Sequence, residues 1–445
     1  MATTITAGNA TNGAAISSDN TGILELKTGT GAGTTAVTIG TDQSVTFAGA
    51  ISSSGNQTVT GNLTVNGNTT LGDANTDTIL MTAAPSIGGA GLGMGFGFRN
   101  RIINGAMVID QRNAGAAVTA NGAFPVDRYQ VSNTSDGAYS AQQDSSAPAG
   151  FVNSVKVTTT TADASLTTTQ QLAFRHIIEG LNVADLGWGT ASAQTVTLSF
   201  WVRSSLTGTF GGSLQNSAAN RSYVFTYTIS AANTWEQKTI TVPGDTTGTW
   251  LTTNGRGIVI WFGLGVGPSA SGTAGSWSAS ELNSATGAVS VIGTLNATWQ
   301  ITGVQLEKGS TATSFDYRPY TTELQLCQRY FETSFNAGTA PANNVSDNFS
   351  GTHTLYVGND GNTQNIPFKV TKRAAASITY YSSNQKASPT ANQWQYYNGT
   401  AWVDATLTQT NRASDSSFNV YYKTAGFSTG QSNSFFGGWA ASAEL

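Results

Sequence analysis

Apolar and polar residues alternate along a series of short segments that Gly, Asn and Ser separate. The clearest segments are QTVTLSFWVRSS (194–205), RSYVFTYTIS (221–230), EQKTITVPG (236–244), the apolar run GIVIWFGLGV (257–266) and TWQITGVQLEKG (298–309). Alternation at a period of two puts one set of side chains on each face of a β-strand, and a continuous apolar run suits a buried strand. Many such strands with turn residues between them predict an all-β sandwich or jelly roll.

The composition of the 445-residue chain agrees with this fold class. Charged residues make up 10%, against about 25% in an ordinary globular protein, and aromatic residues another 10%. Abundant Thr, Gly, Asn and Ser favour strands and turns, while the aromatic content is too high for a disordered chain. The net charge of −4 comes without a basic stripe, so we expect no nucleic acid partner. Cys327 is the one cysteine, which excludes an intrachain disulfide.

The sequence shows no targeting signal. The start MATTITAGNA has neither a basic segment nor an apolar one, and no run of about 18 apolar residues follows that could span a membrane. We therefore expect a protein made in a cytoplasm, without export by a standard signal and without membrane insertion.

Residues 1–90 form a separate compositional block in which Phe47 is the only aromatic residue. Short stretches of alternating apolar and polar residues recur there, as in QTVTGNLTVNGNTTLG (57–72), where Gly61 and Gly67 indicate a repeat of about six residues. This block has too little apolar area for a core of its own, but several copies wrapped around one axis could share an interior. The alternative is a flexible linker rich in Gly, Ser and Thr.

Glycine occupies every second position just after this block, between Leu, Met and Phe residues: Gly91, Gly93, Gly95 and Gly97. The spacing does not fit a dinucleotide-binding fingerprint, and no helix signal follows. A strand with one bare face allows backbones to approach closely, so we interpret the segment as a packed neck around an assembly axis. A flexible hinge is the alternative.

One helix is predicted, over TTELQLCQRYFET (321–333). Leu324, Cys327, Tyr330 and Phe331 share one face, which makes Cys327 a small buried hydrophobic residue rather than a nucleophile. Thr322 and Gln325 have the spacing of a capping box at its start.

Residues 334–445 are predicted to form a second β module. In YYNGTAWV, Asn398-Gly399 predicts a type I′ hairpin turn. Such a hairpin carries aromatic rings on both faces, with Trp394 and Tyr396 on one and Tyr397 and Trp402 on the other. Aromatic rings can pack against the C–H faces of sugars, so these four are the candidate glycan-binding residues. The alternative is that they form the core of the module. The head loops around Trp188, Asn220 and Trp277 are the second place to expect binding.

No catalytic residue, metal site or cofactor is predicted. Glycan hydrolysis needs two carboxylates about 5–9 Å apart, and no short motif pairs the acidic residues of the densest cluster, Asp110, Asp127, Asp136 and Asp144. His176 and His353 lie far apart in the sequence without metal-ligand spacing. GDANTDT (72–78) only partly matches a calcium loop.

Three segments together resemble the receptor-binding head of bacteriophage tail fibres. They are RNRIINGAMVIDQRNAG (99–115), FPVDRY (124–129) and ITGVQLEKGSTATSFDYRPYTTELQLCQRYFE (301–332), and the ending ASAEL is similar to that of the tip module that follows in this family. The resemblance implies a homotrimeric virion fibre with carbohydrate-binding-like β heads. It also implies a structural role for Asp127 and Arg128, as an ion pair that locks the first strands.

These observations predict four parts. Residues 1–95 would attach to the virion and form a repetitive, intertwined β shaft with a glycine-rich neck; 96–320 a jelly-roll-like head; 321–333 a linking helix; and 334–445 a β-sandwich tip.

The expected protein is a non-catalytic, trimeric phage tail fibre assembled in the host cytoplasm. Its N-terminus would meet phage tail or adaptor proteins, and it would bind a bacterial surface polysaccharide or lipopolysaccharide. The alternatives are a tailspike-type polysaccharide depolymerase and a capsid or neck fibre without a receptor role.

Overall fold

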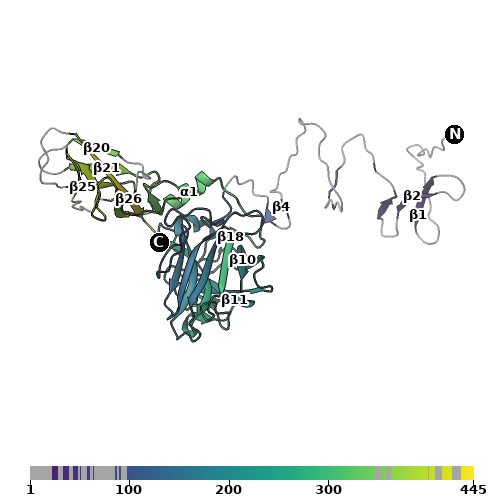
Figure 1. Cartoon of the computed structure of the whole chain (residues 1–445). Coiled ribbons are helices and arrows are strands. Elements are labelled where there is room, and N and C mark those ends of the chain that lie inside the picture. The colour runs from purple at the N-terminus through teal and green to yellow at the C-terminus, as the bar shows by residue number, and fades with distance from the viewer. Residues whose placement is uncertain are drawn as a thin grey trace. The chain divides into compact units, whose positions relative to one another are not determined.

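The computed structural model describes residues 23–28, 34–39, 44–48, 51, 58–60, 64, 86–87, 90–91, 98–345, 352–356, 362–398, 400–405, 413–422 and 432–445. The chain divides into two compact units, Met1–Thr82 and Ala83–Leu445. The predicted all-β fold class is confirmed, because strands dominate the described residues of both units (Figure 1).

The first unit contains an antiparallel sheet of β1 (Leu24–Thr28), β2 (Thr34–Ile39) and β3 (Val45–Phe47). Its register places Leu26 opposite Val37 and Val37 opposite Phe47, and Ile39 opposite Val45. Since side chains two residues apart share a face, these five apolar residues lie on one side of the sheet. Leu26, Val45 and Phe47 are 44%, 51% and 48% exposed, so the apolar side has little cover within one chain.

The neck prediction is largely untested by the structure. Gly93, Gly95 and Gly97 lie outside the described residues. Gly91 ends β5 (Ala90–Gly91), which pairs with β4 (Ser86–Ile87). The packed neck therefore stays a prediction.

Residues 129–308 form a sandwich of two antiparallel sheets (Figure 1). The strands are β6 (Tyr129–Asn133), β7 (Ala138–Asp144), β8 (Ser154–Thr161), β9 (Gln171–Glu179), β10 (Val196–Ser204), β11 (Gly208–Gln215), β12 (Ser222–Ile229), β13 (Glu236–Val242), β14 (Arg256–Val266), β16 (Trp277–Ser278) and β18 (Thr298–Lys308). One sheet has the order β13-β10-β18-β8-β7 and the other β16-β12-β11-β14-β9-β6. The short strands β15 (Ser271–Gly272) and β17 (Ser284–Ala285) pair with each other.

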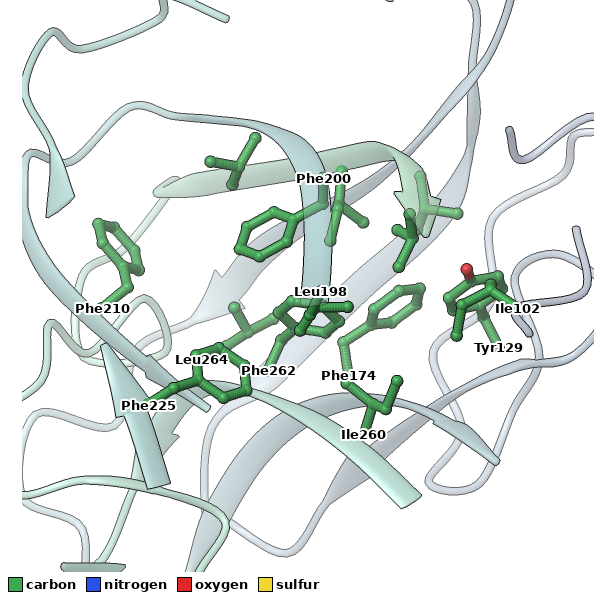
Figure 2. Packing of buried hydrophobic residues seen from close by; sticks show 14 of the residues in the cluster. Ile102, Tyr129, Phe174, Leu198, Phe200, Phe210, Phe225, Ile260, Phe262 and Leu264 are labelled. Carbon is green, nitrogen blue, oxygen red and sulfur yellow. The ribbon is translucent and has the colours of Figure 1, made fainter. Parts of the chain in front are cut away.

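The core lies between the two sheets and is rich in aromatic rings. Figure 2 shows Leu198 and Phe200 of β10 facing the same interior as Phe262 of β14 and Phe174 of β9, and all four are fully buried. The rings of Phe200 and Phe262 meet edge to face, with centroids 5.1 Å apart. The period-two alternation seen in the sequence therefore marks the inward face of these strands.

The segment 99–115, which carries part of the family resemblance, has a structural role. It runs along β18, where Arg101 N donates to Leu306 O and Val304 N donates to Gly105 O. Asn104 adopts a positive φ of 61° and its side-chain amide donates to Ile109 O and Asp127 O. These contacts tie the chain's entry into the sandwich to a central strand.

The helix α1 spans Tyr320–Gln328, and the residues after it form β19 (Phe331–Thr333) instead of continuing the helix as predicted. Pro319 precedes the first turn and no side chain caps it, so the predicted capping box of Thr322 and Gln325 is wrong: Thr322 lies inside the helix. Cys327 is fully buried, as predicted, with Tyr330 beside it.

The C-terminal module is built around the long strand β26 (Ser432–Ser442), which pairs with β19, β20 (Thr352–Tyr356), β22 (Ser377–Ser382) and β23 (Gln395–Tyr397). The strand β24 (Trp402–Asp404) completes this sheet, and β21 (Asn362–Pro367) pairs with β25 (Ser417–Tyr422). Phe418 and Trp439 meet edge to face in its core.

Buried ion pairs connect the sandwich, the helix segment and the C-terminal module. Glu332 and Lys372 are fully buried and 2.6 Å apart. Arg128 pairs with Glu444 rather than with its neighbour Asp127, which instead lies 3.6 Å from Arg112. The predicted Asp127–Arg128 ion pair is therefore wrong, since the two adjacent side chains have different partners.

Candidate carbohydrate-binding face

The hairpin of β23 and β24 divides its aromatic residues between two environments. Trp394, just before β23, is fully buried, and its indole N–H donates to Gly438 O at 3.0 Å. Tyr396 is 7% exposed and packs in the same core. Two of the four candidate glycan-binding residues are thus part of the module's core and offer no free ring face.

Tyr397 and Trp402 lie on the opposite face of the hairpin and pair directly across the strands. Their ring centroids are 5.5 Å apart, and Trp402 also meets the edge of Phe436 at 5.0 Å. Tyr397 is 41% exposed and Trp402 is half-buried. This fixed aromatic pair can present an apolar surface to a ligand.

The hairpin turn differs from the predicted one. Asn398 N donates to Ala401 O at 3.0 Å, and the Asn398 side-chain oxygen accepts from the backbone N–H groups of Thr400 and Ala401. A two-residue turn at Asn398-Gly399 would place Tyr397 opposite Thr400. In the structure Asn398 lies opposite Ala401 and Tyr397 lies opposite Trp402, so the turn is shifted by one residue toward the C-terminus.

A charged polar group adjoins the aromatic pair. Asp404 lies two residues beyond Trp402, about 7 Å along the same strand face. Its carboxylate accepts from Lys386 Nζ at 2.5 Å and from Thr390 Oγ1 at 2.6 Å. Partial burial raises the pKa of Asp404, but these hydrogen bonds outweigh that effect and hold it below its usual value. The face, defined by Tyr397, Trp402, Asp404, Lys386 and Thr390, thus combines rings with an ionised acceptor, a hydroxyl and an ammonium group; we name it the hairpin face.

A second aromatic cluster lies in the sandwich. Trp188, Trp250 and Trp277 meet edge to face in all three pairs, with centroids 4.7, 5.3 and 5.4 Å apart. Beside them Arg221 donates two hydrogen bonds of 2.7 Å to Asp245. The sequence indicated Trp188 and Trp277 but missed Trp250, because nothing local in the sequence links these three loops.

This tryptophan cluster is mainly a packing unit. Each indole N–H has a partner within the sandwich: Gln194 O for Trp188, Asp245 for Trp250 and Pro243 O for Trp277. Trp188 is only 7% exposed. Among the rings of the two sites, only Tyr397 of the hairpin face is exposed; Trp402, Trp250 and Trp277 are all half-buried.

Three of the four clustered acidic residues have structural partners. Asp110 accepts backbone hydrogen bonds from Arg112, Asn113 and Gly115. Asp144 accepts from the backbone N–H of Ser146. Asp127 is fully buried, and burial raises its pKa to about 7 although Arg112 and Gln111 lower it. For Asp136 the contact is made by the backbone and not by the side chain: its N–H donates a hydrogen bond to the carboxylate of Asp163.

The histidines do not form a metal site in the described structure. His176 is buried, with neither ring nitrogen hydrogen-bonded to a described residue, and burial and the charge of Arg128 lower its pKa. His353 lies in β20. Among the described residues no group of three or more His, Cys, Asp or Glu could hold a metal ion, and the weak calcium-loop match at 72–78 lies outside them. No helix within the described ranges is long and apolar enough to cross a membrane.

No protein-family model and no curated protein sequence matches the chain. Solved structures with similar parts include the enzymatically active domain of tailspike protein 4 of bacteriophage CBA120, at 12% identity and a TM-score of 0.25, covering 47% of this chain and 22% of that one. A CBM4 structure has 15% identity and a TM-score of 0.23, covering 46% of this chain and 98% of that one. A family 11 carbohydrate-binding module from Clostridium thermocellum has 13% identity and a TM-score of 0.23, covering 44% of this chain and 98% of that one. The chain thus spans about a fifth of the tailspike structure.

Proposed function

We propose that this chain is a trimeric phage tail fibre that binds a bacterial surface glycan without cleaving it. The observation that carries the proposal is the exposed apolar side of the sheet β1–β2–β3. A soluble protein rarely leaves such a surface uncovered, so the unit needs partners that cover it. Copies of the same chain, each presenting the same face to a common axis, provide that cover.

The gain from this assembly is substantial. Leu26, Val45 and Phe47 are each about half exposed, and full burial of such side chains is worth roughly 1.5–3 kcal/mol. Covering the exposed half of each therefore contributes on the order of 1 kcal/mol per side chain, or roughly 10 kcal/mol for nine side chains in a trimer. We take three as the number of copies because residues 99–332 resemble the heads of phage tail fibres, a resemblance that implies a homotrimer.

Glycan binding is assigned to the hairpin face. Tyr397 and Trp402 would pack against sugar C–H groups while Asp404, Lys386 and Thr390 exchange hydrogen bonds with hydroxyls. One such face binds weakly, but three on one fibre can raise avidity by about 10²–10⁴ if all reach the same surface.

The remaining assignments complete this proposal. The N-terminal segment would attach to phage tail or adaptor proteins, so the mature location is the virion tail after assembly in the host cytoplasm. A depolymerase is less well supported, because Asp110, Asp127 and Asp144 are engaged in structural contacts.

The test is binding of the full chain to an array of bacterial polysaccharides and lipopolysaccharides. The double variant Tyr397→Ala/Trp402→Ala should lose at least tenfold in apparent affinity while keeping the wild-type mass. Tyr317→Ala, which removes an exposed tyrosine of the head, is the matched control and should bind normally. Unchanged binding by the double variant would place recognition elsewhere, and release of new reducing ends from a bound polysaccharide would favour the depolymerase.

A further inference from the structure

A cavity of about 250 Å³ lies where the helix α1 meets the C-terminal module, away from the hairpin face. Residues 109–111, one side of α1, residues 333–338 and Lys369 form its lining. Its size is somewhat below the range of about 300–1,000 Å³ that holds drug-sized ligands, and suits a smaller molecule.

Gln328, the last residue of α1, is the distinctive polar group of this cavity. It is 6% exposed and lines the cavity, yet its side-chain amide makes no hydrogen bond to any described residue. The amide atoms are not among the fully enclosed side-chain atoms that lack a partner, so they face the open space of the cavity and not a sealed interior. The amide offers a donor and an acceptor to whatever enters the cavity.

Other groups of the lining complement this amide. The side-chain N–H groups of Gln111 donate to Asp127 and Phe331 O, which leaves its carbonyl oxygen without a donor among the described residues. Asn336 is exposed on the rim. Tyr320 is 54% exposed and Phe335 is buried, so the cavity also has an aromatic edge and wall.

The charges around the cavity balance. Asp110 and Lys369 are the two charged side chains of the lining, and they have opposite signs. The carboxylate of Asp110 is already engaged by backbone N–H groups of its own loop. The cavity therefore favours an uncharged ligand rich in groups that both donate and accept hydrogen bonds.

We infer that this cavity binds one uncharged pyranose unit of a glycan, with hydroxyls on the amides of Gln328 and Gln111 and a C–H face toward Tyr320. The inference rests on the proposed glycan-binding function but concerns a separate site. The chain would then have two glycan-binding places, the hairpin face and this separate cavity for a single sugar unit.

The experiment is saturation-transfer-difference NMR on the full chain with D-glucose, D-galactose, D-mannose and N-acetylglucosamine as probes. At least one sugar should receive saturation from the wild type. Gln328→Leu, which replaces the unpartnered amide by an apolar group of similar size, should reduce that signal at least tenfold without lowering the melting temperature. Ala337→Trp, which introduces a large ring at an exposed position of the lining, should reduce it as strongly.

The hairpin variant Tyr397→Ala/Trp402→Ala separates this site from the proposed one. Retention of the monosaccharide signal in that variant, with its loss in Gln328→Leu, supports the inference whatever the array shows. Loss in the hairpin variant with retention in Gln328→Leu overturns the inference and leaves the proposed function in place. Absence of a signal from all four sugars on the wild type also overturns it, as does a melting temperature of Gln328→Leu well below wild type, which would mean a structural role for the amide.

Discussion

The carboxyl group of Asp127 should make the head less stable as pH rises toward neutrality. Burial raises its pKa from 3.8 to about 7, although Arg112 and Gln111 lower it. Because the folded chain holds this proton more tightly than the unfolded chain, the stabilising effect is complete below pH 3.8 and is lost as pH rises through about 7. A shift of this size costs on the order of 4 kcal/mol above pH 8, of which roughly 2–3 kcal/mol develops between pH 5 and pH 8.

The variant Asp127→Asn isolates this effect, because its side chain stays neutral and its oxygen can still accept from the Gln111 amide. Urea unfolding followed by tryptophan fluorescence at pH 5, 6, 7 and 8 gives the free energy of unfolding for each form. Relative to wild type, the variant should gain roughly 2–3 kcal/mol across this range. Asp185→Asn, at an exposed ion pair with Arg101, is the control and should follow wild type. Parallel curves for Asp127→Asn and wild type would contradict this prediction, and so would a loss of stability by the variant relative to wild type.

Three further predictions concern assembly and packing. Glu332→Ala leaves Lys372 buried without its partner and should destabilise the C-terminal module by about 3–5 kcal/mol in urea unfolding, whereas exchange of both for apolar residues should cost much less. Gly105→Ala would place its Cβ 2.1 Å from a backbone oxygen of β18, so its melting temperature should fall by the equivalent of at least about 1–3 kcal/mol; an unchanged value would mean that the segment can move away. Val45→Asp should separate the copies in size-exclusion chromatography while Thr46→Asp, on the opposite face of β3, should not; identical elution of both would argue against the apolar face as the interface.

The sequence predicted the strands with strong local patterns. The segments 194–205, 221–230, 236–244, 257–266 and 298–309 correspond to β10, β12, β13, β14 and β18 within a few residues. The strand β11 was missed, because GTFGGSLQ has glycines where the pattern needs side chains. The structure gives the reason: a Cβ on Gly212 would lie 2.4 Å from the Phe225 ring.

Features that depend on distant partners could not be predicted. The helix stops at Gln328 because Phe331–Thr333 pairs with β26, more than a hundred residues later. In the hairpin, alternation separates Trp394 and Tyr396 from Tyr397 and Trp402, but only the packing of Phe418 and Trp439 decides which pair is buried. The side-chain amide of Gln328 and the cavity that it lines have no local sequence signal at all.

We propose that copies of this chain assemble into a fibre through the apolar face of the β1–β2–β3 sheet. Multi-angle light scattering on the purified full chain tests it most directly. We expect a single species of about three times the chain mass of 46.0 kDa, unchanged on dilution. A folded species of one chain mass would contradict it.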